Sequence, residues 1–157
     1  MELIQIEEIS VDRMDAFWAQ HIKYLVEDEI ITDEEDREYF SGSEYRDVIK
    51  GHMERPVDTH HAVWFLRAGV RIGAAQYCTY KSEDGKCFVL DFWVFPEYRG
   101  NGTGHRCFEV LESCTKTDGA SYYEINCDRE NAQRFWRSLG FRDNGLDEYD
   151  MPLMVRR

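Results

Sequence analysis

A glycine-rich turn, Arg99-Gly-Asn-Gly-Thr-Gly104, joins an apolar strand-like run to a helix-like run. Glycine lets the backbone adopt left-handed conformations and come close to a ligand. The first turn of a helix adds free N–H groups and a partial positive charge. A strand, such a turn and a helix together form a binding site for phosphate groups. The turn therefore constrains both the fold, which needs a strand–helix connection here, and the ligand.

Two common phosphate-binding loops do not fit this turn. The P-loop needs a lysine and a hydroxyl residue after its glycines, and here His105 and Arg106 follow. The dinucleotide fingerprint needs G-x-G-x-x-G directly after the strand. Here the glycines alternate at positions 100, 102 and 104, and Pro96–Arg99 intervenes.

The rest of the chain alternates between strand and helix patterns. Residues Glu2–Glu7 alternate apolar and polar and predict a strand. Apolar residues at helical spacing between Met14 and Leu25 predict a helix, and residues 34–53 predict one or two short helices broken near Ser41-Gly42. Three strands are predicted next, at 61–67, 70–80 and 87–95, followed by a helix at 101–117, a strand at 122–127, a helix at 129–139 and a last strand at 147–155.

This order, β-α-α-β-β-β-α-β-α-β, predicts an α+β fold with a mixed, mostly antiparallel sheet flanked by helices. Short turns join the three middle strands, which is typical of an antiparallel meander. The crossover over 87–127 should be right-handed, so its two strands should be parallel with the glycine turn at their carboxyl end. At 157 residues, we expect a single domain spanning 1–157.

Composition excludes several classes of function. The net charge is −12, with 17 acidic and 6 basic residues in 1–60, so we expect no nucleic-acid partner and an attraction for cationic small molecules. No apolar run is long enough to span a membrane, and the N-terminus lacks the basic residues of a secretory signal, which predicts a cytoplasmic protein. The five cysteines form no C-x-x-C pair, and His60-His61 is expected to begin a strand, so no metal site is predicted.

Two segments resemble the GNAT superfamily of N-acetyltransferases. Val94-Phe-Pro-Glu-Tyr-Arg-Gly-Asn-Gly-Thr-Gly104 resembles the family's coenzyme A loop, with Arg99, Gly102 and Gly104 at its signature positions. Asn131-Ala-Gln-Arg-Phe-Trp-Arg-Ser-Leu-Gly-Phe141 resembles its helix ending in an aromatic pair and Leu-Gly-Phe. The order of elements agrees along nearly the whole chain, although residues 1–60 match by pattern only.

The resemblance implies acetyl-CoA as co-substrate and no metal. The pyrophosphate would lie at the turn, the Val94 backbone would bind the pantetheine arm like an added strand, and Asn131 would contact the same arm. It also implies transfer of an acetyl group to the amine of a small acceptor, and a homodimer is common in the family. The residues implied to bind the donor are Val94, Arg99, Gly100, Asn101, Gly102, Thr103, Gly104 and Asn131.

Asp91 is the candidate general base, because it is the only charged residue in the apolar run Phe88–Phe95. Desolvation makes a carboxylate a stronger base, and family members place an acidic residue near this position. A structural carboxylate bonded to its neighbours is an equal alternative. Members with a Glu-Asp pair carry Glu where this chain has Leu90, and an expected bulge leaves the direction of Asp91 open.

Trp136 stands where many family members carry the tyrosine that protonates the leaving thiolate. An indole N–H donates a hydrogen bond but does not deliver a proton, and Trp136 also suits the core. The proton would then come from water, the ammonium product or another tyrosine such as Tyr80 or Tyr122. Two functions follow: direct acetyl transfer to a small, cationic amine in a ternary complex, or a non-catalytic acyl-CoA-binding sensor.

Overall fold

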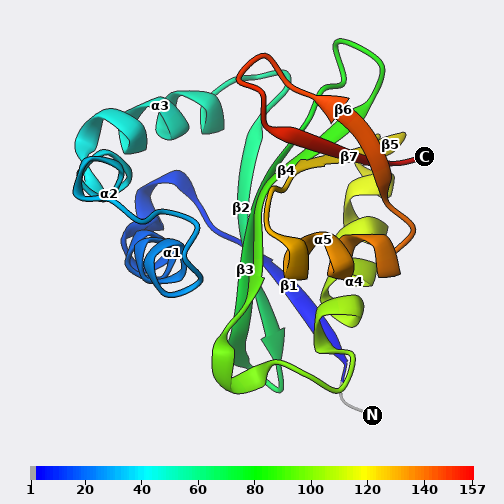
Figure 1. Ribbon diagram of the computed structural model, residues 1–157, viewed down its shortest axis with the longest axis horizontal. Coiled ribbons are helices and arrows are strands. Elements are labelled where there is room, and N and C mark those ends of the chain that lie inside the picture. The colour runs from blue at the N-terminus through cyan, green and yellow to red at the C-terminus, as the bar shows by residue number, and fades with distance from the viewer. Residues whose placement is uncertain (1–2) are drawn as a thin grey trace.

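The computed structural model describes residues 3–157, which form one seven-stranded sheet with helices on both faces (Figure 1). Along the sheet the strands follow the order β1-β2-β3-β4-β5-β7-β6. Only β4 and β5 pair in parallel, which confirms the mixed, mostly antiparallel sheet. The strands are β1 (Ile4–Glu8), β2 (His60–Arg67), β3 (Val70–Thr79), β4 (Lys86–Val94), β5 (Tyr122–Asn126), β6 (Arg142–Leu146) and β7 (Pro152–Arg156). Glu2 of the predicted first strand lies outside the described residues.

Five α-helices divide between the two faces of the sheet. In Figure 1, the first three lie together on one side, and the last two lie on the other. The break predicted near Gly42 is confirmed, because this residue ends one helix and caps the next. The helices are α1 (Asp15–Glu27), α2 (Glu34–Ser41), α3 (Ser43–Met53), α4 (Thr103–Thr117) and α5 (Glu130–Ser138).

Each face of the sheet has its own hydrophobic core. On the α1–α3 face, Phe17 and Trp18 pack against Trp64 and Trp93 of the sheet. On the other face, Phe108 of α4 is fully buried, together with residues from β2, β3, β5 and α5. Burial of this kind contributes roughly 1.5–3 kcal/mol for each large apolar side chain. The sheet therefore separates two independently packed layers.

The crossover through α4 brings β4 and β5 together over a short stretch only. They pair at three positions, from Lys86↔Tyr122 to Phe88↔Glu124. The register of β4 against β3 then shifts between the pairs Gln76↔Asp91 and Tyr77↔Val89, which leaves Leu90 as an extra residue. This confirms the expected bulge. Beyond it β4 pairs with β3 alone, so the two parallel strands no longer share hydrogen bonds.

The C-terminal region differs from the single strand predicted at 147–155. It forms a hairpin of β6 and β7, and β7 inserts between β5 and β6. All five residues of β6 are exposed, so the strand has no buried face to produce an alternating pattern. It is held by main-chain pairing to β7, for which the sequence gives no side-chain signal.

Candidate active site

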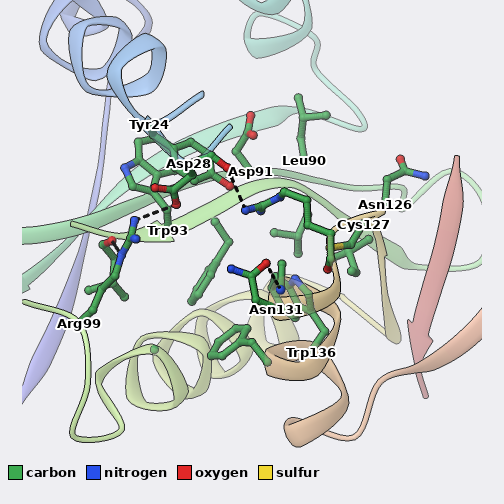
Figure 2. Close-up of a pocket in the computed structure, with 18 of the residues that line it drawn as sticks. Tyr24, Asp28, Leu90, Asp91, Trp93, Arg99, Asn126, Cys127, Asn131 and Trp136 are labelled. Carbon is green, nitrogen blue, oxygen red and sulfur yellow. Dashed lines mark hydrogen bonds and ion pairs between the residues drawn. The ribbon is translucent and has the colours of Figure 1, made fainter. Parts of the chain in front are cut away.

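A cleft of about 320 Å³ opens where β4 and β5 stop pairing. Its walls come from the end of α1, the second half of β4, the glycine turn, the end of β5 and the start of α5 (Figure 2). Six of the nine residues expected to act as the base or to bind the donor line it, namely Asp91, Val94, Arg99, Gly100, Gly104 and Asn131, and Leu90 and Trp136 line it as well. Asn101, Gly102 and Thr103 belong to the same turn but do not line the cleft.

The glycine turn has a backbone that few other residues would adopt. Gly100, Asn101 and Gly102 all have positive φ angles, of 95°, 55° and 75°. Helix α4 begins directly afterwards, and Thr103 closes the turn by donating from Oγ1 to the Gly100 carbonyl over 2.9 Å. The first N–H groups of a helix lack partners within it. The turn therefore presents a helix N-terminus beside the cleft.

Gly104 is needed because another residue would touch α5. A Cβ atom at this position would lie 2.8 Å from Cε1 of Phe135. Phe135 in turn stacks on Phe92 of β4, with ring centroids 5.9 Å apart. The absence of a side chain at Gly104 lets α4 and α5 approach each other at the cleft.

The Arg99 side chain makes two contacts within the protein. Its Nε donates to the Val94 carbonyl over 2.7 Å, and its Nη2 donates to Asp28 Oδ2 over 2.9 Å. Figure 2 shows the second contact across one side of the cleft. Arg99 thus ties the glycine turn to the end of β4 and to the residue that follows α1.

Asp91 points from the bulge towards α1 and is largely buried, with its side chain 13% exposed. One carboxylate oxygen, Oδ2, accepts from Gln76 Nε2 over 2.6 Å and from His21 Nε2 over 2.9 Å. Gln76 is itself fixed, because its Oε1 accepts from His60 Nε2 over 2.8 Å. His21 of α1 and Gln76 of β3 thereby hold Asp91 through a single oxygen, and His60 of β2 fixes Gln76.

His21 is held as firmly as Asp91. Its ring stacks between Phe17 and Tyr45, with centroids at 5.7 and 6.0 Å. Its Nδ1 is buried and has no hydrogen-bond partner within residues 3–157. An unpaired buried N–H costs more than an unpaired lone pair. We therefore place a proton on Nε2, which donates it to Asp91 in the hydrogen bond.

An aromatic pair forms the wall beside Asp91. Tyr24 of α1 stacks on Trp93 of β4 with ring centroids 4.5 Å apart and planes 5° apart. Tyr24 is the only hydroxyl-bearing side chain among the residues that line the cleft. Burial and the nearby Asp91 charge raise the pKa of this phenol, so it stays protonated. Neither Tyr80 nor Tyr122 lines the cleft, and the Tyr122 hydroxyl donates to Asp84.

The opposite wall comes from the end of β5 and the start of α5. Cys127 is buried there, and desolvation raises the pKa of its thiol. Arg129 caps α5, and its Nη1 reaches the Asp28 carbonyl over 3.4 Å. Asn131 is exposed, and its Oδ1 accepts from the next backbone N–H. Trp136 is only 7% exposed and packs edge-on against Phe92, Phe108 and Phe141.

Sequence reasoning missed four of the residues that build this site. His21 lies in the apolar helical pattern of α1 and looks like any other core residue. Gln76 is a polar residue flanked by buried apolar residues in β3, which is a signal that could have been noticed. Tyr24 and Arg129 reach the cleft from segments far apart in the chain, so only the tertiary structure brings them together.

Comparison with known proteins agrees with this fold. The profile of the acetyltransferase (GNAT) family matches residues 15–141. No curated protein matches the chain. Among solved structures, the PaiA N-acetyltransferase of Thermoplasma acidophilum, in complex with coenzyme A, shares 17% identity over 98% of both chains, with a TM-score of 0.75. An acyl-CoA N-acyltransferase of Pseudomonas aeruginosa shares 11% identity over 100% of both chains, with a TM-score of 0.68.

The chain therefore belongs to the GNAT acetyltransferase family. It is an acyltransferase of this family. Within residues 3–157, no helix is long and apolar enough to cross a membrane. The same residues contain no group of three or more His, Cys, Asp and Glu side chains placed to hold a metal ion.

Proposed function

We propose that this protein transfers the acetyl group of acetyl-CoA to the amine of a small, cationic acceptor, directly and in a ternary complex. The observation that carries the proposal is the placement of Asp91 in the cleft. Asp91 lines the same cleft as the glycine turn, and its Oδ2 is fixed by Gln76 and His21. A carboxylate held in the cleft supports this role, because a general base must lie within hydrogen-bond reach of the amine that it deprotonates.

The donor would lie along β4, with its phosphates at the turn formed by Gly100, Asn101, Gly102, Thr103 and Gly104. Here the helix N-terminus supplies N–H donors and positive potential. The main chain of β4 at Val94 would bind the pantetheine arm, and Asn131 would contact that arm from α5. Arg99 would act by holding the turn against β4, since its guanidinium is engaged by Val94 and Asp28.

In the reaction, Asp91 accepts a proton from the ammonium group of the acceptor. The freed amine attacks the thioester carbonyl, so an N–C bond forms as the C–S bond breaks, and the second proton lost by the attacking nitrogen passes to the leaving thiolate. Trp136 lies in the core and does not supply the proton that the thiolate needs. Tyr24 is the hydroxyl available in the cleft, and we propose that it donates a hydrogen bond to the leaving sulfur.

The test begins with calorimetric titration of acetyl-CoA, followed by measurement of thiol release with a panel of primary amines. Asp91→Asn should retain acetyl-CoA affinity and lower kcat by on the order of 10²–10⁴-fold. It should also lose the acid limb of the pH–rate profile. Failure to bind acetyl-CoA at high micromolar concentration contradicts the proposal, and an unchanged pH profile removes Asp91 from the role of base.

The position of Trp136 favours a second candidate, an acyl-CoA-binding module that senses the donor without turning it over. Its indole packs in the core where many family members carry a proton-donating tyrosine. Tight binding of acetyl-CoA without thiol release on a broad amine panel would select this alternative.

A further inference from the structure

Four charged side chains line the cleft, and two of them neutralise each other. Arg99 and Asp28 form an ion pair with an N–O distance of 2.9 Å. The other two are Asp91 and Arg129. Asp91 accepts hydrogen bonds from His21 and from the amide of Gln76, and it forms no ion pair with a Lys or Arg side chain of 3–157. The cleft therefore offers one negative and one positive charge to what it binds.

The Arg129 guanidinium has further N–H groups besides the one that contacts the Asp28 carbonyl. Its side chain is half-buried, and the bond of 3.4 Å from Nη1 to the Asp28 carbonyl is long for a hydrogen bond. It makes no ion pair with any other residue of 3–157. A guanidinium carries five N–H donors in a planar fork that matches a carboxylate. Removing such a group from water without an anionic partner is unfavourable, so a partner supplied by a ligand fits it well.

Asp91 and Arg129 act on one part of the cleft. Both charges are felt by the Tyr24 phenol, whose pKa the Asp91 carboxylate raises and the Arg129 guanidinium lowers. Arg129 also lowers the pKa of the Cys127 thiol on the facing wall. Asp91, Arg129 and Tyr24 also line the same cleft.

We propose that the acceptor is a free amino acid, whose ammonium group meets Asp91 and whose carboxylate is bound by Arg129. This inference rests on the proposed function and narrows its acceptor. An amino acid with a second amine satisfies both observations, because it keeps a net positive charge that the acidic residues 1–60 attract and also supplies the carboxylate. Amines without a carboxylate leave Arg129 unpaired.

The experiment compares matched acceptors. The common amino acids, with lysine and ornithine included, are assayed by thiol release beside their primary amides and their decarboxylated amines. Each set is run with the wild-type protein, with Arg129→Gln and with Arg134→Gln. Arg134 is an exposed arginine on α5 that does not line the cleft, so it controls for loss of charge on that helix. Acetyl-CoA affinity of each variant is measured by calorimetry.

We expect the amino acid to exceed its amide and amine in kcat/KM by on the order of 10- to 100-fold, the usual effect of losing a hydrogen-bonded charge. Arg129→Gln should remove this preference, mainly through KM, and leave acetyl-CoA affinity within about threefold. Arg134→Gln should behave as wild type.

Three results overturn the inference. In the first, the amides or amines react as well as the amino acids. In the second, Arg129→Gln weakens the binding of acetyl-CoA and leaves the acceptor KM unchanged, which assigns Arg129 to the donor site. In the third, acetyl-CoA binds and no amino acid is acetylated. Failure of acetyl-CoA to bind wild-type protein is a different result, because it contradicts the proposed function itself.

Discussion

His60 provides a quantitative test of the hydrogen-bonded chain that holds Asp91. Its ring is 5% exposed and donates from Nε2 to Gln76 Oε1, which turns the Gln76 amide nitrogen towards Asp91. Burial lowers the pKa of His60 from 6.5 to about 4. At pH values between these two pKa values, the His60 ring is protonated in the unfolded chain and neutral in the folded protein. The free energy of unfolding therefore falls as the pH drops through this range, and the full contribution is present above it.

The size of the effect follows from the two pKa values. At 1.36 kcal/mol per pKa unit, the titration of His60 should lower the free energy of unfolding by about 2 kcal/mol between about pH 7.5 and pH 5. The variant His60→Gln keeps an amide donor for Gln76 and cannot titrate. It should be less stable than wild type at the higher pH, by on the order of 1 kcal/mol, and should lose this part of the pH dependence.

The assay is urea unfolding followed by tryptophan fluorescence at both pH values, for which the chain supplies four tryptophans. The quantity to compare is the difference in free energy of unfolding between wild type and variant, in which the contributions of the other titrating groups cancel. At a typical urea dependence, 2 kcal/mol moves the midpoint by about 1 M. His61→Gln is a control of opposite sign, because the hydrogen bond with Glu8 raises the pKa of His61. Parallel pH profiles of wild type and His60→Gln would refute the reasoning.

Three further predictions concern the cleft and the core. Gly104→Ala, whose Cβ would lie 2.8 Å from Phe135, should weaken acetyl-CoA binding by on the order of tenfold in calorimetry. Gly51→Ala, where nothing lies within 4 Å, should leave that affinity unchanged and raise stability to urea by about 0.5–1 kcal/mol. Because burial raises the pKa of Cys87 and Cys107 to about 12, intact mass should show neither alkylated by iodoacetamide at about pH 8 until urea unfolds the protein. Early labelling of either thiol in the folded state would contradict that assignment.

Local sequence signals predicted most of the fold because most elements have a buried face. The apolar spacing of α1, the break at Gly42 and the turn before α4 are all readable within a few residues. The β6–β7 hairpin was missed because β6 is exposed along its whole length and its pairing is a main-chain property. Alternating and helical spacings of apolar residues arise from burial. A strand that is exposed on both faces therefore shows neither spacing.

The site was predicted in part for a similar reason. The glycine turn and Asp91 stand out within their own segments, as three close glycines and as one charge in an apolar run. The residues that orient Asp91, directly or through Gln76, come from α1, β2 and β3. None of them is marked as a site residue by the sequence of its own segment. The direction of Asp91 depends on the extra residue at Leu90, which reverses the side-chain alternation of β4. That reversal is set by pairing with β3 and not by residues 88–95 themselves.

The separation of the molecule into two cores by its sheet has a consequence for how such a protein changes over time. The glycine turn leads into the core formed by α4 and α5, whereas the side chains around Asp91 pack with the core formed by α1–α3. Substitutions that reshape the acceptor wall can therefore be absorbed within one layer, without repacking the layer that positions the nucleotide end of the donor. We expect libraries confined to α1–α3 to yield altered amine preferences at constant donor affinity. The sheet thus separates most of the acceptor wall from the core behind the glycine turn, and the contacts of Arg99 and Arg129 with Asp28 connect the two sides.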